Sequence, residues 1–463
     1  MNLIENRTFD EIRLGDTASL AHKLGSTDLD KIAALSAAVA PSHMDEALAK
    51  SDAYNAVAAQ GMWADILFST LVATQLPGPG TTYVSRSINF LQPVKAGDTI
   101  TASIAVKEKK AANRVILDCE ALNQSGSVVM KGIAEVIAPA YKVSRPRMDT
   151  PEPGIFEKGR GYRRLIELTH GLDPIRTAVV HPADTVSLLG AVEAARAKLI
   201  VPVLVGPLTK IRAAAEAAKL DLSPYEIVPA GHSTAAAAQA VAMARGGQVE
   251  ALMKGSLHTD ELMRAVVDEE RGLRTARRIS HVFAIDAPAY PRPLFITDAA
   301  INVYPTLEDK HDIVQNAIDL THALGISEPK VAILSAVETV SSKLRSTLDA
   351  AALCKMADRG QITGAVLDGP LAFDNAVSEE AAKTKGIVSP VAGKADIFVV
   401  PDLEAGNMLA KQLEYLAGAD IAGVVLGAKV PIILTSRADK TLARLGSSAI
   451  ALLLARRGKS VKS

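Results

Sequence analysis

The chain has 463 residues, 48% of them hydrophobic, which is enough for more than one sizeable core. Its 51 basic and 51 acidic side chains give a formal net charge of zero and no polybasic stretch stands out, which argues against nucleic acid as a partner. The first residues are charged and lack the apolar core of a signal peptide, and Lys429 and Pro431 interrupt the apolar run 421–434, so we predict neither a leader nor a membrane span.

Residues 1–140 are predicted to form an α+β domain. Helical patterns cover 29–50 and 53–76, and strand-like runs rich in β-branched residues follow at 99–107, 114–122 and 127–137. A helix followed by a meander of short strands is typical of a helix wrapped by an antiparallel sheet. Residues 141–160 contain three prolines, Gly154 and several charges, a composition that indicates a linker.

From residue 161 to 463 short apolar strands alternate with alanine-rich helices. Strands are predicted at 177–180, 202–205, 250–253, 293–296, 330–334, 364–367, 397–400 and 423–427. This alternation favours mostly parallel sheets, and about 300 residues exceed the size typical of one core, so we expect two α/β lobes with a cleft between them. Ligands of open α/β sheets bind beyond the carboxyl ends of the strands.

Polar residues follow several of these strands. Taken singly, most are explained as helix caps or surface charges, and His258 and His281 as structural histidines. Their repeated placement at strand ends is what favours a binding site. The candidates are Lys254, Ser256, Arg264, Asp298, Asn302, Asp374, Asn375, Asn407, Ser436, Arg437 and Asp439.

Several long motifs carry a family resemblance over roughly 160–463. They are LMKGSLHTDELMRAVV, TDAAINVYP, DGPLAFDNAVSEEAAKTKGI, VAGKADIFVVPDLEAGNMLAKQLEYLAGAD and AGVVLGAKVPIILTSRAD. They occur in the order found in the phosphate acetyl/butyryltransferase family, and this region resembles its butyryltransferase-like branch most. The resemblance implies a two-lobed α/β phosphotransacylase fold related to isocitrate and isopropylmalate dehydrogenases, a cleft active site, and a homo-oligomer, usually a dimer.

The resemblance also implies the reaction: acyl-CoA and inorganic phosphate are interconverted with acyl phosphate and CoA, the acyl group being acetyl or butyryl. Arg437 would hold phosphate through its bidentate fork, Ser436 would orient the thiol or donate to the oxyanion, and Arg264 matches a family arginine. The family's aspartate base falls on Ala443 here, and Asp439 lies nearby but out of register, so the thiol base stays open. Substrate binding is assigned to Lys254, Ser256, Asp298, Asn302, Asp374, Asn375, Asn407 and Asp439.

Residues 10–138 resemble the MaoC-like hot-dog family of (R)-specific enoyl-CoA hydratases. The segments AALSAAVAPSHMD, QGM, LPGPGTTY and FLQPVKAGDT carry this resemblance. The family hydrates with an Asp and a His five residues apart, and His43 is present as the catalytic candidate. Ala38 stands where the Asp is expected, and Ala40 where an Asn is usual. Two alternatives follow: a hydratase using His43, or a non-catalytic domain that binds acyl-CoA or joins subunits.

Other chemistry has no motif in the chain. G-x-G-x-x-G, G-x-x-x-x-G-K-[ST] and H-E-x-x-H are all absent, so we predict no bound cofactor and no metal, with coenzyme A thioester as a substrate only. A nicotinamide dehydrogenase on the related fold is the structural runner-up. Cys119 and Cys354 lie far apart without a CxxC, which is typical of free thiols in a reducing cytosol.

Overall fold

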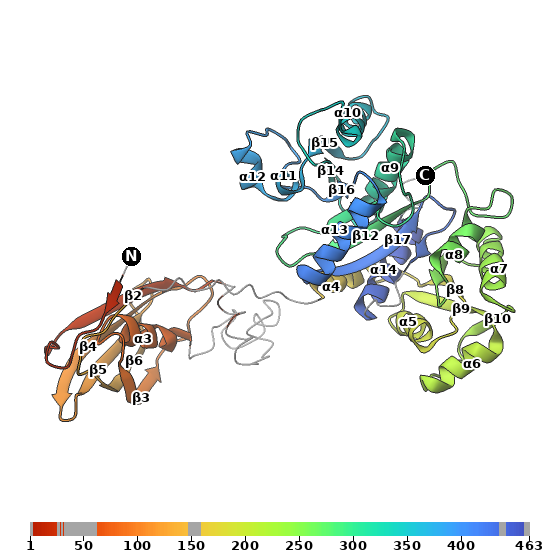
Figure 1. Cartoon of the computed structure of the whole chain (residues 1–463). Coiled ribbons are helices and arrows are strands. Elements are labelled where there is room, and N and C mark those ends of the chain that lie inside the picture. Colours follow the sequence, from red (N-terminus) through yellow and green to blue (C-terminus); the bar gives the residue numbers. More distant parts are fainter. Residues whose placement is uncertain are drawn as a thin grey trace. The chain divides into compact units, whose positions relative to one another are not determined.

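The computed structural model describes residues 3–25, 28, 31, 63–146, 159–434 and 441–457. These residues divide into two compact units, Met1–Ile155 and Phe156–Ser463, coloured red to orange and yellow to blue in Figure 1. Each unit has its own hydrophobic core and is described by itself.

The described part of the N-terminal unit contains a five-stranded antiparallel sheet, in the order β2-β4-β5-β6-β3, packed on helix α3. Buried and exposed residues alternate along β4, as expected for a sheet with one face on the core. The helix α3 (Trp63–Thr74) brings Phe68 and Leu71 into that core, where both are fully buried. The strands are β2 (Thr17–Lys23), β3 (Thr82–Phe90), β4 (Thr99–Lys110), β5 (Arg114–Leu122) and β6 (Val128–Ile137), and the short strands β1 (Leu3–Glu5) and β7 (Ser144–Pro146) pair separately.

The C-terminal unit is built on one eleven-stranded sheet, in the order β10-β9-β8-β11-β18-β17-β12-β13-β16-β14-β15. The strands from β10 to β18 in that order form one parallel block, and those from β13 to β15 form another. The strands are β8 (Ile175–Val180), β9 (Ile200–Gly206), β10 (Glu226–Pro229), β11 (Ala251–Lys254), β12 (Ser280–Asp286), β13 (Leu294–Thr297), β14 (Lys330–Leu334), β15 (Val366–Leu371), β16 (Ile397–Val399), β17 (Asp420–Leu426) and β18 (Ile432–Ile433).

Antiparallel pairings through β17 and β12 join the two blocks. The sequence predicts two lobes, and the structure places both blocks in a single continuous sheet. The strands predicted from the sequence do not include β12, whose seven residues follow the charged stretch 268–278. β12 pairs antiparallel with β13 on one side and β17 on the other, and so connects the two blocks within one sheet.

Helices cover both faces of the large sheet, and local capping explains where several begin. The side chain of Asp184 caps α5, that of Asp402 caps α13, and Thr306 and Asp309 form a capping box at α9. The helices are α4 (Arg160–Thr169), α5 (Thr185–Arg196), α6 (Leu208–Ala217), α7 (Ser233–Arg245), α8 (Thr259–Val266), α9 (Leu307–Ala323), α10 (Arg345–Asp358), α11 (Phe373–Val377), α12 (Glu379–Thr384), α13 (Leu403–Leu416) and α14 (Thr441–Arg457). Among the described residues, none of the helices is long and apolar enough to span a bilayer.

Candidate active site

A cavity of about 450 Å³ lies against the central strands β12 and β17. Because alternate residues of a strand point to one face, His281 and Phe283 of β12 and Ile421 and Gly423 of β17 together form its floor. One wall is the end of β11 and the start of α8, and the other is α13. The remaining lining residues are Lys254, Leu257, His258, Thr259, Ala300, Asn407, Ala410, Lys411, Glu414 and Leu434.

The β11–α8 wall of this cavity carries one lysine, Lys254, beside a helix whose first turn also holds Asp260 and Glu261. Lys254 ends β11 and is only 8% exposed. His258 is the N-cap of α8, whose first turn presents backbone N–H groups. A cation beside a helix N-terminus is a suitable environment for an anion. The Glu261 carboxylate accepts hydrogen bonds from the His258 backbone (2.9 Å) and the Ser233 hydroxyl (2.8 Å), and these bonds lower its pKa.

The α13 wall adds an amide and two charges. Asn407 donates a hydrogen bond from Nδ2 to the carbonyl oxygen of Ala299 at 3.2 Å, so its side chain is held in place from behind. Lys411 and Glu414 follow on the same helix and also line the cavity. Lys254, the last residue of β11, and Asn407, on α13, therefore lie at one cavity.

His281 on the floor is the polar residue that sequence reasoning counted as merely structural. It is 1% exposed, and burial lowers the pKa of its imidazole to about 3. Its ring packs edge-on against Phe283, with centroids 4.3 Å apart, and its Nδ1 has no hydrogen-bond partner among the described residues. No strand-end pattern marks this residue, because it lies at the start of β12 rather than after a strand.

Three predicted site residues of the large unit, Ser436, Arg437 and Asp439, lie outside the described residues, as do His43 and Ala38 of the N-terminal unit. Leu434, the last described residue before the first three, lines the cavity. Ala443, on which the family's base position falls, belongs to α14 and lines a different cavity.

Asp298, Asn302 and Ser256 bond to the protein itself. The Asp298 carboxylate accepts hydrogen bonds from the backbones of Ala300, Ile301 and Asn302 and from Asn302 Nδ2, at 2.6–3.1 Å, while burial raises its pKa. The Ser256 hydroxyl donates to the His181 carbonyl oxygen at 2.8 Å, which ties the loop after β11 to the end of β8. None of these three is among the cavity-lining residues.

Asp374 and Asn375 follow β15, the edge strand of the second block. Lys385 lies 3.0 Å from the Asp374 carboxylate, and its hydrogen bond lowers the pKa of Asp374. Asn375 is fully buried and donates from Nδ2 to Glu338 at 3.4 Å. Neither residue lines the cavity.

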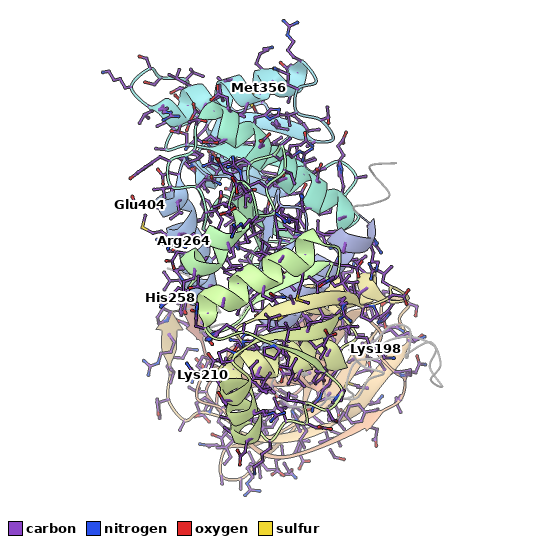
Figure 2. The ribbon with its side chains drawn as sticks, turned by 90° about the vertical axis from the view of Figure 1, so that its right-hand side faces the viewer. Lys198, Lys210, His258, Arg264, Met356 and Glu404 are labelled. Carbon is purple, nitrogen blue, oxygen red and sulfur yellow. The ribbon has the colours of Figure 1, made fainter. Side chains whose placement is uncertain are left out.

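Arg264 projects from the last turn of α8 and is exposed. It is on the same helix as the His258 cap but is not among the lining residues, and Figure 2 shows both at the edge of the molecule where Glu404 also appears. The structure thus places Arg264 outside the cavity, on a helix that forms one of its walls.

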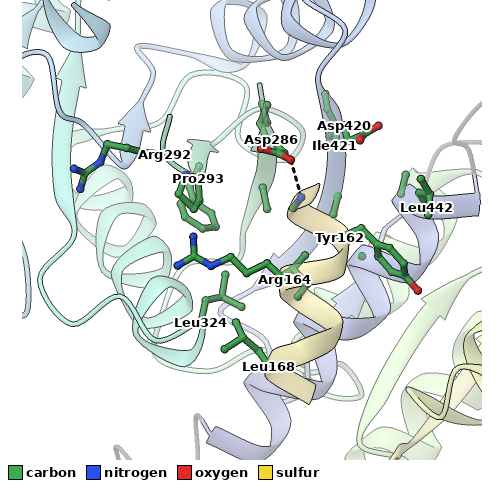
Figure 3. Close-up of a pocket in the computed structure, with 18 of the residues that line it drawn as sticks. Tyr162, Arg164, Leu168, Asp286, Arg292, Pro293, Leu324, Asp420, Ile421 and Leu442 are labelled. Atoms are coloured by element: carbon green, nitrogen blue, oxygen red, sulfur yellow. Dashed lines mark hydrogen bonds between the residues drawn. The ribbon is translucent and has the colours of Figure 1, made fainter. Parts of the chain in front are cut away.

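A second cavity, of about 340 Å³, lies on the opposite side of the central strands, beneath α4 (Figure 3). Its wall includes Ala284 and Ile285 of β12 and Ala422 of β17, and Ile421 of β17 lines both cavities. The Asp286 carboxylate accepts a hydrogen bond from the Gly161 backbone at 2.7 Å and so anchors the start of α4. None of the predicted site residues that the structure describes lines this second cavity, whereas Lys254 and Asn407 line the first one.

Comparison with known proteins agrees with this architecture. Residues 231–452 match the family "Phosphate acetyl/butaryl transferase", and residues 17–124 match "MaoC like domain". A phosphate acetyltransferase of Rhizobium meliloti is 62% identical over 301 residues, covering 65% of this chain and 95% of that protein. A phosphate butyryltransferase of Clostridium beijerinckii is 43% identical over 287 residues, covering 62% of this chain and 95% of that protein.

Among solved structures, a branched-chain phosphotransacylase from Enterococcus faecalis V583 is similar, with a TM-score of 0.55 and 29% identity. The match covers 61% of this chain and 99% of that chain. The large unit therefore has a phosphotransacylase-like fold. The chain belongs to the phosphate acetyl/butyryl transferase family and carries an N-terminal MaoC-like domain in addition.

Proposed function

We propose that the C-terminal unit is a phosphate acyltransferase that interconverts acyl-CoA and phosphate with acyl phosphate and CoA. The observation that carries this proposal is the convergence of Lys254, the α8 N-terminus and Asn407 on one cavity beside Leu434, from which the chain continues directly to Ser436 and Arg437. Both substrates are anionic, and such a site supplies fixed cations and oriented N–H groups for them. The relatives named as acetyl- and butyryltransferases support the same reaction.

In the direction of acyl phosphate synthesis, an oxygen of hydrogen phosphate attacks the thioester carbonyl carbon. A C–O bond forms as the C–S bond breaks, and the proton of hydrogen phosphate passes to the departing CoA sulfur. Lys254 and Arg437 neutralise the phosphate, and Ser436 orients the sulfur or donates to the oxyanion. Both substrates are bound together, so no covalent acyl-enzyme is required.

The test is thiol release from acetyl-CoA and butyryl-CoA with and without phosphate. We expect Arg437→Ala to reduce the phosphate-dependent rate roughly 100-fold or more, because it removes a bidentate phosphate ligand. Arg212→Ala, on the exposed face of α6, is the matched control and should behave as wild type. Unchanged phosphate-dependent turnover in Arg437→Ala would refute the assignment.

We further propose that the large unit shares the fold of the isocitrate and isopropylmalate dehydrogenases, with substrates in the cleft, and that the protein is a homo-oligomer. A continuous sheet with two parallel blocks joined by antiparallel strands supports the first point. Both cysteines are free, which fits a cytoplasmic enzyme. Sedimentation of the full chain tests the oligomer, and a single-protomer mass would contradict it.

For the N-terminal unit, (R)-specific hydration of enoyl-CoA is the second candidate, supported by the match of residues 17–124 to the MaoC-like domain. Ala38 in place of the partner aspartate favours the alternative, in which the domain binds acyl-CoA or holds subunits together without catalysis. Crotonyl-CoA separates the two. Water addition that His43→Ala abolishes establishes the hydratase, whereas binding without water addition establishes the non-catalytic role.

A further inference from the structure

The floor and the wall of the active-site cavity differ in chemistry. Phe283 and Ile421 make much of the floor apolar, whereas Lys254 supplies a cation to the wall formed by β11 and α8. An acyl group is suited to the floor and a phosphate to the wall, because each then meets matching polarity. His281 is the polar side chain within that apolar floor.

The surroundings of the ring indicate where its proton lies. Nδ1 is buried and has no hydrogen-bond partner in the part of the chain that the structure describes, and a buried N–H without an acceptor is rarer in proteins than a buried acceptor without a donor. The imidazole is therefore neutral with its proton on Nε2. Nε2 is the ring atom nearest to Gly423: a Cβ built on that glycine would lie 2.8 Å from Nε2 and 3.1 Å from the Leu434 carbonyl oxygen. Gly423 and Leu434 both line the cavity, so the N–H is held at its floor.

We propose that His281 is a catalytic residue, whose neutral imidazole donates a hydrogen bond from Nε2–H to the acyl carbonyl oxygen and to the oxyanion that develops there. This inference rests on the acyltransferase function proposed above. A donor fixed by packing in an apolar environment stabilises developing negative charge without reorganisation. The burial that keeps the imidazole neutral also prevents it from acting as the thiol base, so this role is distinct from the base that the sequence left open.

Two amide substitutions separate the ring nitrogens. The side-chain nitrogen of His281→Gln takes the place of Nε2, whereas that of His281→Asn takes the place of Nδ1. We expect Gln to keep kcat within about 10-fold of wild type, and Asn and Phe to lower kcat by roughly 100- to 1,000-fold with KM changed far less. His170→Gln, an exposed histidine away from the cavity, is the control. Equal activity of the Gln and Asn variants, or an active His281→Phe, would overturn the role.

Nitrogen-15 NMR of the histidine side chains in the wild-type protein tests the same inference without any variant. The expected result is an Nε2–H tautomer that stays neutral at about pH 6. An Nδ1–H tautomer or an imidazolium would overturn the proposal even if every variant failed to fold. Wild-type protein without phosphate-dependent thiol release would instead refute the acyltransferase function itself, so the two failures are distinguishable.

Discussion

The two parallel blocks of the large sheet place polar residues after their strands in similar sequence contexts but use them differently. Lys254 and His258, after β11, line the cavity, whereas Asp374 and Asn375, after β15, are engaged by Lys385 and Glu338. In the sheet order, β11 is separated from the central β17 only by β18, while β15 is the edge strand. Polar residues at the end of β11 therefore line the cavity whereas those after β15 do not, and their polarity alone does not distinguish the two strand ends.

The largest effect is expected from a buried ion pair in the second block, whose loss should lower the free energy of unfolding. Lys310 and Asp349 form an ion pair of 2.8 Å between α9 and α10, and both are buried. Lys310→Met leaves the Asp349 carboxylate without its main partner, which should cost about 3–5 kcal/mol of unfolding free energy. Urea unfolding measures this. Lys310→Met combined with Asp349→Leu should recover most of the loss, and a single variant as stable as wild type would contradict the expectation.

Substituting one lysine in each block compares their contributions to catalysis. Lys254→Met removes a cation from the cavity and should lower kcat/KM for phosphate-dependent thiol release roughly 100-fold. Lys385→Met removes a surface cation that contacts Asp374 and Glu338 and should change the rate less than about 2-fold. A similar loss of kcat/KM in the two variants would show that the cavity lysine is no more important for catalysis than the surface lysine.

A substitution at Gly423, on the central strand β17, tests whether the His281 imidazole must be held in place. A methyl group there would lie 2.8 Å from His281 Nε2, so Gly423→Ala must displace the imidazole. We expect a loss of about 1–3 kcal/mol of stability together with a lower kcat. Gly231→Ala is the matched control, because no atom lies within 4 Å of the added methyl group. Wild-type kcat in Gly423→Ala would argue against a precisely held imidazole.

The smallest effect concerns pH. Burial lowers the pKa of His281 to about 3 from 6.5, so the unfolded chain takes up a proton more readily than the folded one, and stability falls as the pH drops below 6.5. Between about pH 7 and about pH 5 this amounts to about 2 kcal/mol. His281→Phe should lack this increment in urea unfolding. The other titratable groups lining the cavity, which remain in both proteins, are Lys254, His258, Lys411 and Glu414.

The sequence predicts much of the fold, because strand length and alternation are local properties. The run 330–334 coincides with β14, and 114–122 with β5. The central strand β12 could not be predicted in this way, since its place depends on antiparallel pairing with β13 and β17, far along the chain.

For the candidate site too, some features follow from the sequence and others only from the tertiary structure. Sequence motifs indicated the family and the reaction class and selected Lys254 and Asn407 as candidates, because residues next to strand ends follow from local patterns. Only the tertiary structure decided that Asp298 is held by its own loop, that Asp374 lies at a sheet edge, and that His281 lies on the floor of the cavity. The physical reason is that burial and hydrogen-bond satisfaction depend on residues distant in sequence, which no local pattern encodes.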